Sequence, residues 1–106
     1  MKLNNQFRMK IGLLVICFNR PSQTRLVLNS ILQSKFNLSS IQIFISLDGP
    51  RNESETVKTE LVYREAKEFS KGMSNVKINR HSINLGLKKH VLSAISNAFS
   101  SLPNFA

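Results

Sequence analysis

Two nearly uninterrupted apolar runs constrain the fold more than any other feature of this 106-residue chain. Seven of the eight residues from Ile11 to Phe18 are apolar, and the run from Ile41 to Leu47 is apolar at almost every position. Runs of this length, rich in β-branched residues and without alternation, predict strands that are buried on both faces. Such strands are typical of parallel sheets covered by helices, so the sequence predicts an α/β domain.

The first run ends at a polar turn, Asn19-Arg20-Pro21, and an apolar pattern of helical period follows it. This predicts a helix from about Pro21 to about Lys35, with the proline in its first turn. Two strands joined by one helix form a βαβ unit, for which a right-handed parallel crossover is strongly preferred. The carboxyl ends of both strands then meet at one edge of the sheet, so Arg20 and Asp48 are expected to lie near each other.

The second half of the chain repeats the alternation of strand and helix. A helix is predicted to begin near Arg51, with acidic residues in its first turn, and to end at Gly72. The segment 75–80 alternates apolar and polar residues, which predicts a third, shorter strand nearer an edge. A third helix follows a loop over 81–87. The expected apolar faces of the two helices consist of Val57, Leu61, Val62, Ala66 and Phe69, and of Leu87, Val91, Ile95, Ala98 and Leu102.

The charge is strongly positive and unevenly distributed. The net charge is +9, and all six acidic residues fall between Asp48 and Glu68. This excess predicts attraction to anions, which include nucleic acid, acidic lipid headgroups and phosphorylated small molecules. Lys88, Lys89 and His90 fall in the first turn of the third helix, where the helix dipole disfavours cations. The cluster indicates either an anion site or an exposed basic turn without a partner.

Composition and missing motifs exclude several classes of protein. Cys17 is the only cysteine, so an intrachain disulfide and a cysteine-built metal site are excluded, and a small buried hydrophobe is expected. Neither a P-loop motif nor a G-x-G-x-x-G after the first strand is present, which argues against P-loop enzymes and dinucleotide-binding halves. No apolar run is long enough to span a membrane, and a cytoplasmic location is expected.

Three short motifs lie in order on these elements: Phe-Asn-Arg-Pro at 18–21, Ser-Leu-Asp-Gly-Pro at 46–50 and Asn-Leu-Gly-Leu-Lys-Lys-His at 84–90. They resemble the N-terminal half of GT-A-fold glycosyltransferases, above all bacterial family 2-type enzymes and the N-acetylglucosaminyltransferase I group. The resemblance extends from about residue 11 to about residue 102. It implies a three-layer α/β/α, Rossmann-like fold with a mainly parallel sheet, of which residues 1–106 form the N-terminal, incomplete part of a single domain.

The resemblance implies a site for a nucleotide-diphosphate sugar, with a UDP-sugar as the expected donor and a hydroxyl of a glycan or lipid as the acceptor. In the family, the arginine after the first strand and the aspartate that ends the second hold the nucleotide. The loop and helix start after the third strand close over the nucleotide or diphosphate. The nucleotide-sugar-binding residues expected on this basis are Asn19, Arg20, Asp48, Asn84, Gly86, Lys89 and His90.

Other interpretations of these residues stay open. Asp48 before a glycine and a proline is also typical of a tight turn in which the carboxylate caps the loop, and Arg20 also suits a surface position. His81 is expected to be structural. The family's acidic metal-binding motif has no match, because no acidic residue follows Glu68. A divalent metal, Mn²⁺ or Mg²⁺, is therefore expected only for the complete enzyme, no catalytic residue is assigned, and the chain alone is expected to be inactive.

Two alternative functions remain at this point. A nucleotidyltransferase-like nucleotide-binding domain has strands in the same order, but its loop after the first strand usually contains glycines that Asn19-Arg20-Pro21-Ser22 lacks. A basic, non-enzymatic module for nucleic acid or an anionic membrane would explain the charge. No aromatic pattern, helix-turn-helix signature or zinc spacing supports a nucleic-acid partner, so none is expected. Peripheral contact with the inner membrane surface is compatible with a glycosyltransferase.

Overall fold

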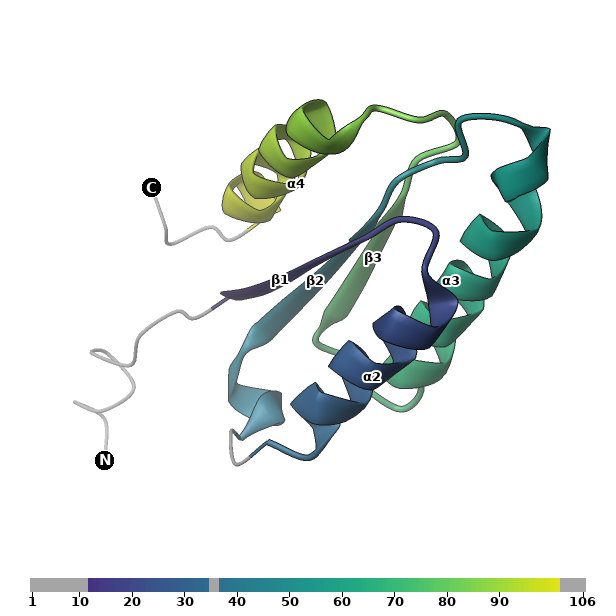
Figure 1. Cartoon of the computed structure of the whole chain (residues 1–106). Helices are drawn as coiled ribbons and strands as arrows, with labels where there is room; N and C mark the ends of the chain where they lie inside the picture. Colours follow the sequence, from purple (N-terminus) through teal and green to yellow (C-terminus); the bar gives the residue numbers. More distant parts are fainter. Residues whose placement is uncertain (1–11, 35–36, 102–106) are drawn as a thin grey trace, which may run out of the picture.

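A computed structural model describes residues 12–34 and 37–101, and within them the chain forms three parallel strands and three α-helices (Figure 1). The sequence-predicted strands and helices are all present. Two short 3₁₀ turns, η1 and η2, were not predicted. The elements in chain order are β1 (Gly12–Cys17), α2 (Pro21–Leu32), η1 (Leu38–Ser40), β2 (Gln42–Leu47), η2 (Glu53–Glu55), α3 (Thr56–Ser70), β3 (Val76–Arg80) and α4 (Leu87–Ser101).

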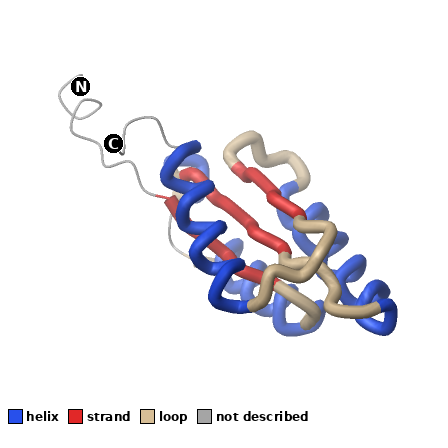
Figure 2. The backbone as a smooth tube through the Cα atoms, turned by 90° about the horizontal axis from the view of Figure 1, so that it is seen from above, coloured by secondary structure: helices blue, strands red, loops and turns tan. Residues whose placement is uncertain are grey.

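The strand order is β1-β2-β3, and both pairs are parallel. β2 is therefore the central strand, with Ile45 opposite Val15 on one side and Ile78 on the other. Helices α2 and α3 lie on one face of the sheet and α4 lies on the other, so the elements form three layers (Figures 1 and 2). This confirms the α/β class, and the parallel βαβ arrangement places the carboxyl ends of all three strands at one edge.

The main core lies between the sheet and the pair α2 and α3. Alternate residues of β2 point to this side, and its intervening residues Phe44 and Ser46 point toward α4. β2 is buried along nearly its whole length, as its apolar run predicts. The buried residues of this core are Val15, Cys17, Leu28, Ile41, Ile43, Ile45, Leu47, Val62, Ala66 and Phe69.

The prediction that the first strand is buried on both faces is wrong. Ile16 is 36% exposed, Leu14 is half-buried, and the only strand that pairs with β1 in the described part of the chain is β2. Within residues 12–34 and 37–101, β1 is an edge strand, and α4 is the element that covers the face carrying Leu14 and Ile16. An apolar run indicates that a strand is largely buried, but it does not indicate whether that strand lies in the centre or at the edge of the sheet.

The predicted apolar face of α3 is also partly wrong. Val57 and Leu61 are 68% and 41% exposed. The buried face consists of Thr59, Val62, Ala66 and Phe69. These positions follow the spacing of 3, 4 and 3 residues that keeps one helical face against the sheet, and a threonine occupies one of them. Val57 lies nearly on the opposite side of the helix, and Leu61 also lies away from the buried face, in keeping with their exposure.

In α4 the face that packs on the sheet contains His90 and Ala94, both 2% exposed. The predicted stripe positions Leu87 and Ile95 are instead 78% and 40% exposed. The buried face of α4 therefore carries a polar residue, His90, and its ring contacts Ser46 of β2, as described below. Leu102 lies outside the described residues, as do Ile11, the leader over 1–8, Lys35 at the predicted end of the first helix, and 103–106.

Two boundary residues behave as predicted. Pro21 lies in the first turn of α2, and Gly72 follows α3 with a φ of 76°, a conformation that glycine adopts without strain. α2 ends at Leu32, three residues before the predicted end. Among the helices described, none is long and apolar enough to cross a lipid bilayer.

Candidate functional site

A cavity of about 350 Å³ lies at the carboxyl ends of β1 and β2. The turn after β2 is held against β1 by a hydrogen bond from the Asp48 main-chain N–H to the Cys17 carbonyl, at 2.9 Å. The loop before α4 and the first turn of α4 close the other side. The residues that line the cavity are Ile16, Cys17, Phe18, Asp48, Arg51, Asn84, Gly86, Leu87 and His90.

Asp48 is the centre of the site and is only 4% exposed. Its Oδ1 accepts hydrogen bonds from the main-chain N–H groups of Gly49 and Leu85, both at 2.8 Å. Its Oδ2 accepts from the Gly86 N–H and from the Asn84 side-chain amide, both at 3.2 Å. A carboxylate has about four acceptor positions. Asp48 uses them to tie the loop before α4 to the end of β2.

His90 reaches the same cluster from the first turn of α4. Its Nε2 lies 2.8 Å from the Ser46 hydroxyl, and its Nδ1 lies 3.9 Å from Asp48 Oδ2. A neutral ring with its proton on Nδ1 fits both neighbours, since the Ser46 hydroxyl can then donate to Nε2. Burial lowers the pKa of His90, the charge of Asp48 raises it, and His81 lowers it again. The His90 ring is therefore buried and neutral, and it forms part of the cavity lining.

Two glycines allow the loops to approach each other closely. Gly86 has a φ of 84°, which lets the chain turn so that its N–H faces Asp48. A Cβ on Gly49 would lie 2.5 Å from the main-chain carbon of Ile83, so no other residue fits there without displacing a loop. Asn84 completes the junction because its side-chain amide also donates to the Gly49 carbonyl, at 2.9 Å. The cavity is thus built on main-chain contacts between two loops.

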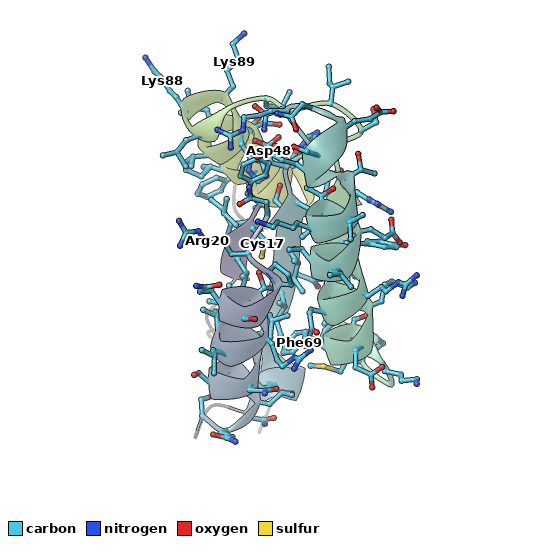
Figure 3. The ribbon with its side chains drawn as sticks, turned by 45° about the vertical axis from the view of Figure 1, so that its right-hand side comes forward. Cys17, Arg20, Asp48, Phe69, Lys88 and Lys89 are labelled. Carbon is cyan, nitrogen blue, oxygen red and sulfur yellow. The ribbon has the colours of Figure 1, made fainter. Side chains whose placement is uncertain are left out.

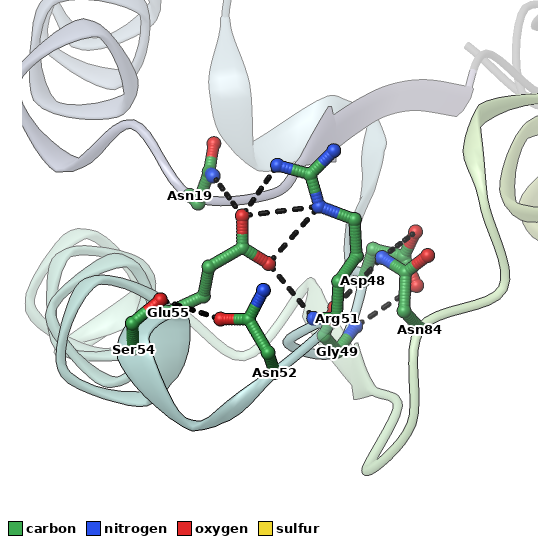
Figure 4. Close-up of polar contacts among 8 residues, drawn as sticks. All are labelled: Asn19, Asp48, Gly49, Arg51, Asn52, Ser54, Glu55 and Asn84. Carbon is green, nitrogen blue, oxygen red and sulfur yellow. Dashed lines mark hydrogen bonds and ion pairs between the residues drawn. The ribbon is translucent and has the colours of Figure 1, made fainter.

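A second polar cluster joins the turn after β1 to the start of α3 (Figure 4). The Glu55 carboxylate accepts hydrogen bonds from the Asn19 side-chain amide at 3.0 Å, from the Arg51 main-chain N–H at 2.8 Å and from the Arg51 guanidinium. The bonds from the Arg51 side chain and then its N–H lower the pKa of Glu55 to about 2. The Arg51 guanidinium also lies 5.3 Å from the centre of the Phe18 ring.

The expected site residues are only partly brought together. Asp48, Asn84, Gly86 and His90 line one cavity, whereas Arg20 and Lys89 are exposed and do not line it. The strand ends meet at one edge as predicted, but the Arg20 side chain points outward from the turn before α2, and Lys89 points away beside Lys88 (Figure 3). Asn19 contacts the cavity only indirectly, through Glu55 and Arg51.

Arg51 is the charged cavity residue that the sequence analysis missed, and the apolar lining residues Ile16, Cys17, Phe18 and Leu87 were not assigned to the site either. In the sequence analysis Arg51 has a place at the start of a helix and no further role. The useful signal was its position directly after Asp48-Gly49-Pro50, because a residue that follows a turn at the carboxyl edge of a sheet lies where ligands bind.

The remaining candidates behave as ordinary buried groups. Cys17 is buried, and burial raises the pKa of its thiol to about 11 while a hydrogen bond with Thr24 acts in the opposite direction. This confirms a small buried hydrophobe in place of a reactive thiol. The His81 ring packs edge-on against the His90 ring, with centroids 5.5 Å apart, and within the described residues its buried Nε2 has no hydrogen-bond partner.

Comparisons with known proteins found none that is significantly similar to this chain. No family model matches the chain, and neither the curated proteins nor the solved structures contain a significant match. Within residues 12–34 and 37–101, no group of three or more histidine, cysteine, aspartate or glutamate side chains is placed to hold a metal ion.

Proposed function

We propose that this chain is the N-terminal, donor-binding part of a GT-A-fold glycosyltransferase, and that the cavity binds the nucleotide of a nucleotide-diphosphate sugar. The observation that carries this proposal is the cavity around Asp48 at the carboxyl edge of a parallel sheet. In open α/β sheets, ligands bind in the crevice outside the carboxyl ends of the strands. Residues of all three motifs of the resemblance line the cavity: Phe18, Asp48, and Asn84, Gly86, Leu87 and His90 of the segment 84–90.

The lining suits the nucleoside part of such a ligand. Ile16, Phe18 and Leu87 supply apolar surface, and Asn84 supplies a polar side chain. Small-molecule sites typically combine an apolar lining with a small number of placed polar groups, in volumes from roughly 300 Å³ upward. A UDP-sugar is the expected donor, and its base and ribose are the parts that a cavity of about 350 Å³ accommodates.

The start of α4 favours the negative charge of a diphosphate. Leu87 opens the helix at the rim of the cavity, and the first N–H groups of a helix lack partners within it. Lys88 and Lys89 add two exposed positive charges to the same turn. A cationic first turn is unfavourable by itself, and a bound anion would remove that cost.

The geometry changes the roles that the resemblance implies for two residues. Asp48 and His90 are expected to contact the nucleotide in the family, but here their polar atoms face the protein. We therefore infer that Asp48 and His90 shape the cavity, and that the ligand contacts Asn84, Leu87 and the apolar wall.

A divalent metal, Mn²⁺ or Mg²⁺, is expected in the complete enzyme, where it would neutralise charge on the leaving diphosphate. The described residues do not fit that ion. The Asp48 carboxylate already accepts four hydrogen bonds, and the Glu55 carboxylate is occupied by Arg51 and Asn19. The transfer to an acceptor hydroxyl therefore depends on residues other than those described here.

The proposal is tested by titrating the full chain with UDP and following its amide resonances. We expect the largest shifts at Phe18, Gly86 and Leu87, which line the cavity. Leu87→Glu and Leu92→Glu form a matched pair, because both residues are exposed on α4 and only the first lines the cavity. A carboxylate at the cavity rim should weaken UDP binding by about tenfold or more, from charge repulsion at short range.

Equal binding by the two variants would contradict the proposal. Shifts confined to exposed lysines, reproduced by inorganic diphosphate and abolished by moderate salt, would instead support the basic non-enzymatic module.

A further inference from the structure

Arg51 lines the cavity, and one edge of its guanidinium is not used by Glu55. Its Nε lies 3.1 and 3.2 Å from the two Glu55 oxygens, and its Nη2 donates to Glu55 Oε2. Among the described residues no acceptor is found for Nη1. Figure 4 shows one terminal nitrogen of the guanidinium facing Glu55 and the other turned away from it. The outer edge of the group is therefore available to a ligand.

We propose that Arg51 binds the phosphate groups of the nucleotide in this cavity, an inference that rests on the proposed function. Arg51 is the only cation among the residues that line the cavity, since His90 is neutral. A guanidinium has five N–H donors in a planar fork, so one edge can pair with a carboxylate while another pairs with a phosphate.

The surroundings of Arg51 fix its position before any ligand binds. Glu55 holds one edge of the guanidinium, and the Phe18 ring lies beneath it at 5.3 Å. Glu55 is itself anchored by Asn19 and by the Arg51 main-chain N–H, so its position does not depend on the guanidinium alone. Groups that are already ordered lose less conformational freedom when a ligand binds.

Arg20 and Lys89, the cations that the resemblance selected, lack such an arrangement. Neither lines the cavity, and among the described residues neither has an ion pair that would fix its side chain, whereas Arg51, although also exposed, pairs with Glu55. They contribute to the attraction of anions at long range, which salt screens. Arg51 supplies the short-range contact, and this difference provides the test.

The experiment measures the affinities of the full chain for UDP and for uridine by titration calorimetry. Arg51→Gln is expected to weaken UDP binding by about 10- to 100-fold, the loss typical of one charge-assisted contact, and to change uridine binding by less than about twofold. Arg64→Gln is the matched control, since Arg64 also pairs with a glutamate four residues away but lies on α3 and does not line the cavity. It should change neither affinity.

A second variant distinguishes loss of the phosphate contact from loss of the fold. Arg51→Lys keeps the positive charge and its ion pair with Glu55, but it lacks the outer N–H edge. We expect it to retain uridine binding and to lose most of the UDP affinity that Arg51→Gln loses. Wild-type UDP affinity in either variant would overturn the assignment, as would an equal loss for UDP and uridine. If the wild-type chain binds neither ligand, the proposed function itself fails.

Discussion

Replacement of Asp48 by asparagine tests whether this residue holds the site together. The asparagine side chain would keep one oxygen and would place an amide nitrogen where the other oxygen stands. Two of the four donors around Asp48, which come from Gly49, Leu85, Gly86 and Asn84, would then face another donor. Hydrogen bonds to charged groups are worth about 1.5–3 kcal/mol each, so two of them amount to about 3 kcal/mol or more.

A loss of this size is large for a domain of 106 residues. Each kcal/mol corresponds to a change in Tm of roughly 4–8 °C, so Asp48→Asn should lower the Tm by about 12–24 °C or more. Urea unfolding gives the free energy of unfolding, and hydrogen exchange reports the Leu85 and Gly86 amides directly. Exchange at the Leu85 or the Gly86 amide, whichever one faces the new amide nitrogen, should accelerate more than exchange at the central strand β2.

Glu53→Gln is the control for charge, because Glu53 is exposed in η2 and loses the same unit of charge. It should change the free energy of unfolding by less than about 0.5 kcal/mol. A loss below about 1 kcal/mol in Asp48→Asn, with unchanged protection of Leu85 and Gly86, would refute the reasoning.

Two further predictions concern the same junction. Gly49→Ala should destabilise the chain by about 1–3 kcal/mol or more in urea unfolding, because its Cβ would meet the Ile83 main chain at 2.5 Å. Gly72→Ala, which has open space around its Cβ and only a φ of 76° to accommodate, should cost less, about 1–2 kcal/mol, and the reverse order would contradict the structure. The pKa of His90 lies below its ordinary value of 6.5 in the folded chain, chiefly through burial. The unfolded chain then binds more protons, so stability should be complete above pH 6.5 and fall as the pH drops toward the folded pKa. Urea unfolding between about pH 5 and 7.5 should show this loss in the wild type and a weaker one in His90→Gln, and equal slopes would speak against it.

The sequence predicts the elements well because each is specified by a local pattern. The apolar run around Ile45 and the helix start at Pro21 depend on residues that are neighbours in the chain. The burial of individual side chains depends on strand order, which local patterns do not contain. Ile16 is exposed because β1 lies at the edge of the described sheet. His90 of α4 is buried and contacts Ser46 of β2, a residue distant from it in the sequence.

For the candidate site, too, the sequence predicted which segments meet but not where each side chain points. Asp48, Asn84, Gly86 and His90 lie on segments whose ends must meet in a parallel sheet, and the structure brings them together. Arg20 was expected to join them, but its side chain points outward, and the direction of an exposed side chain is not fixed by position in the sequence. Arg51 was overlooked because the segment 51–55 was interpreted only as the start of a helix, and the pairing of Arg51 with Glu55 beside the Phe18 ring depends on the folded structure.

The bonds from Asp48 to the loop before α4 also determine when the cavity can form. They join residues 36 to 38 positions apart, which is a long loop to close in a chain of this size. A folding intermediate in which β1, α2, β2 and α3 had already assembled would have Asp48 in place and no opposite wall. If the cavity binds UDP as proposed, binding would be absent until α4 docks, and the time course of UDP binding during refolding would report this final step separately from the formation of the main core.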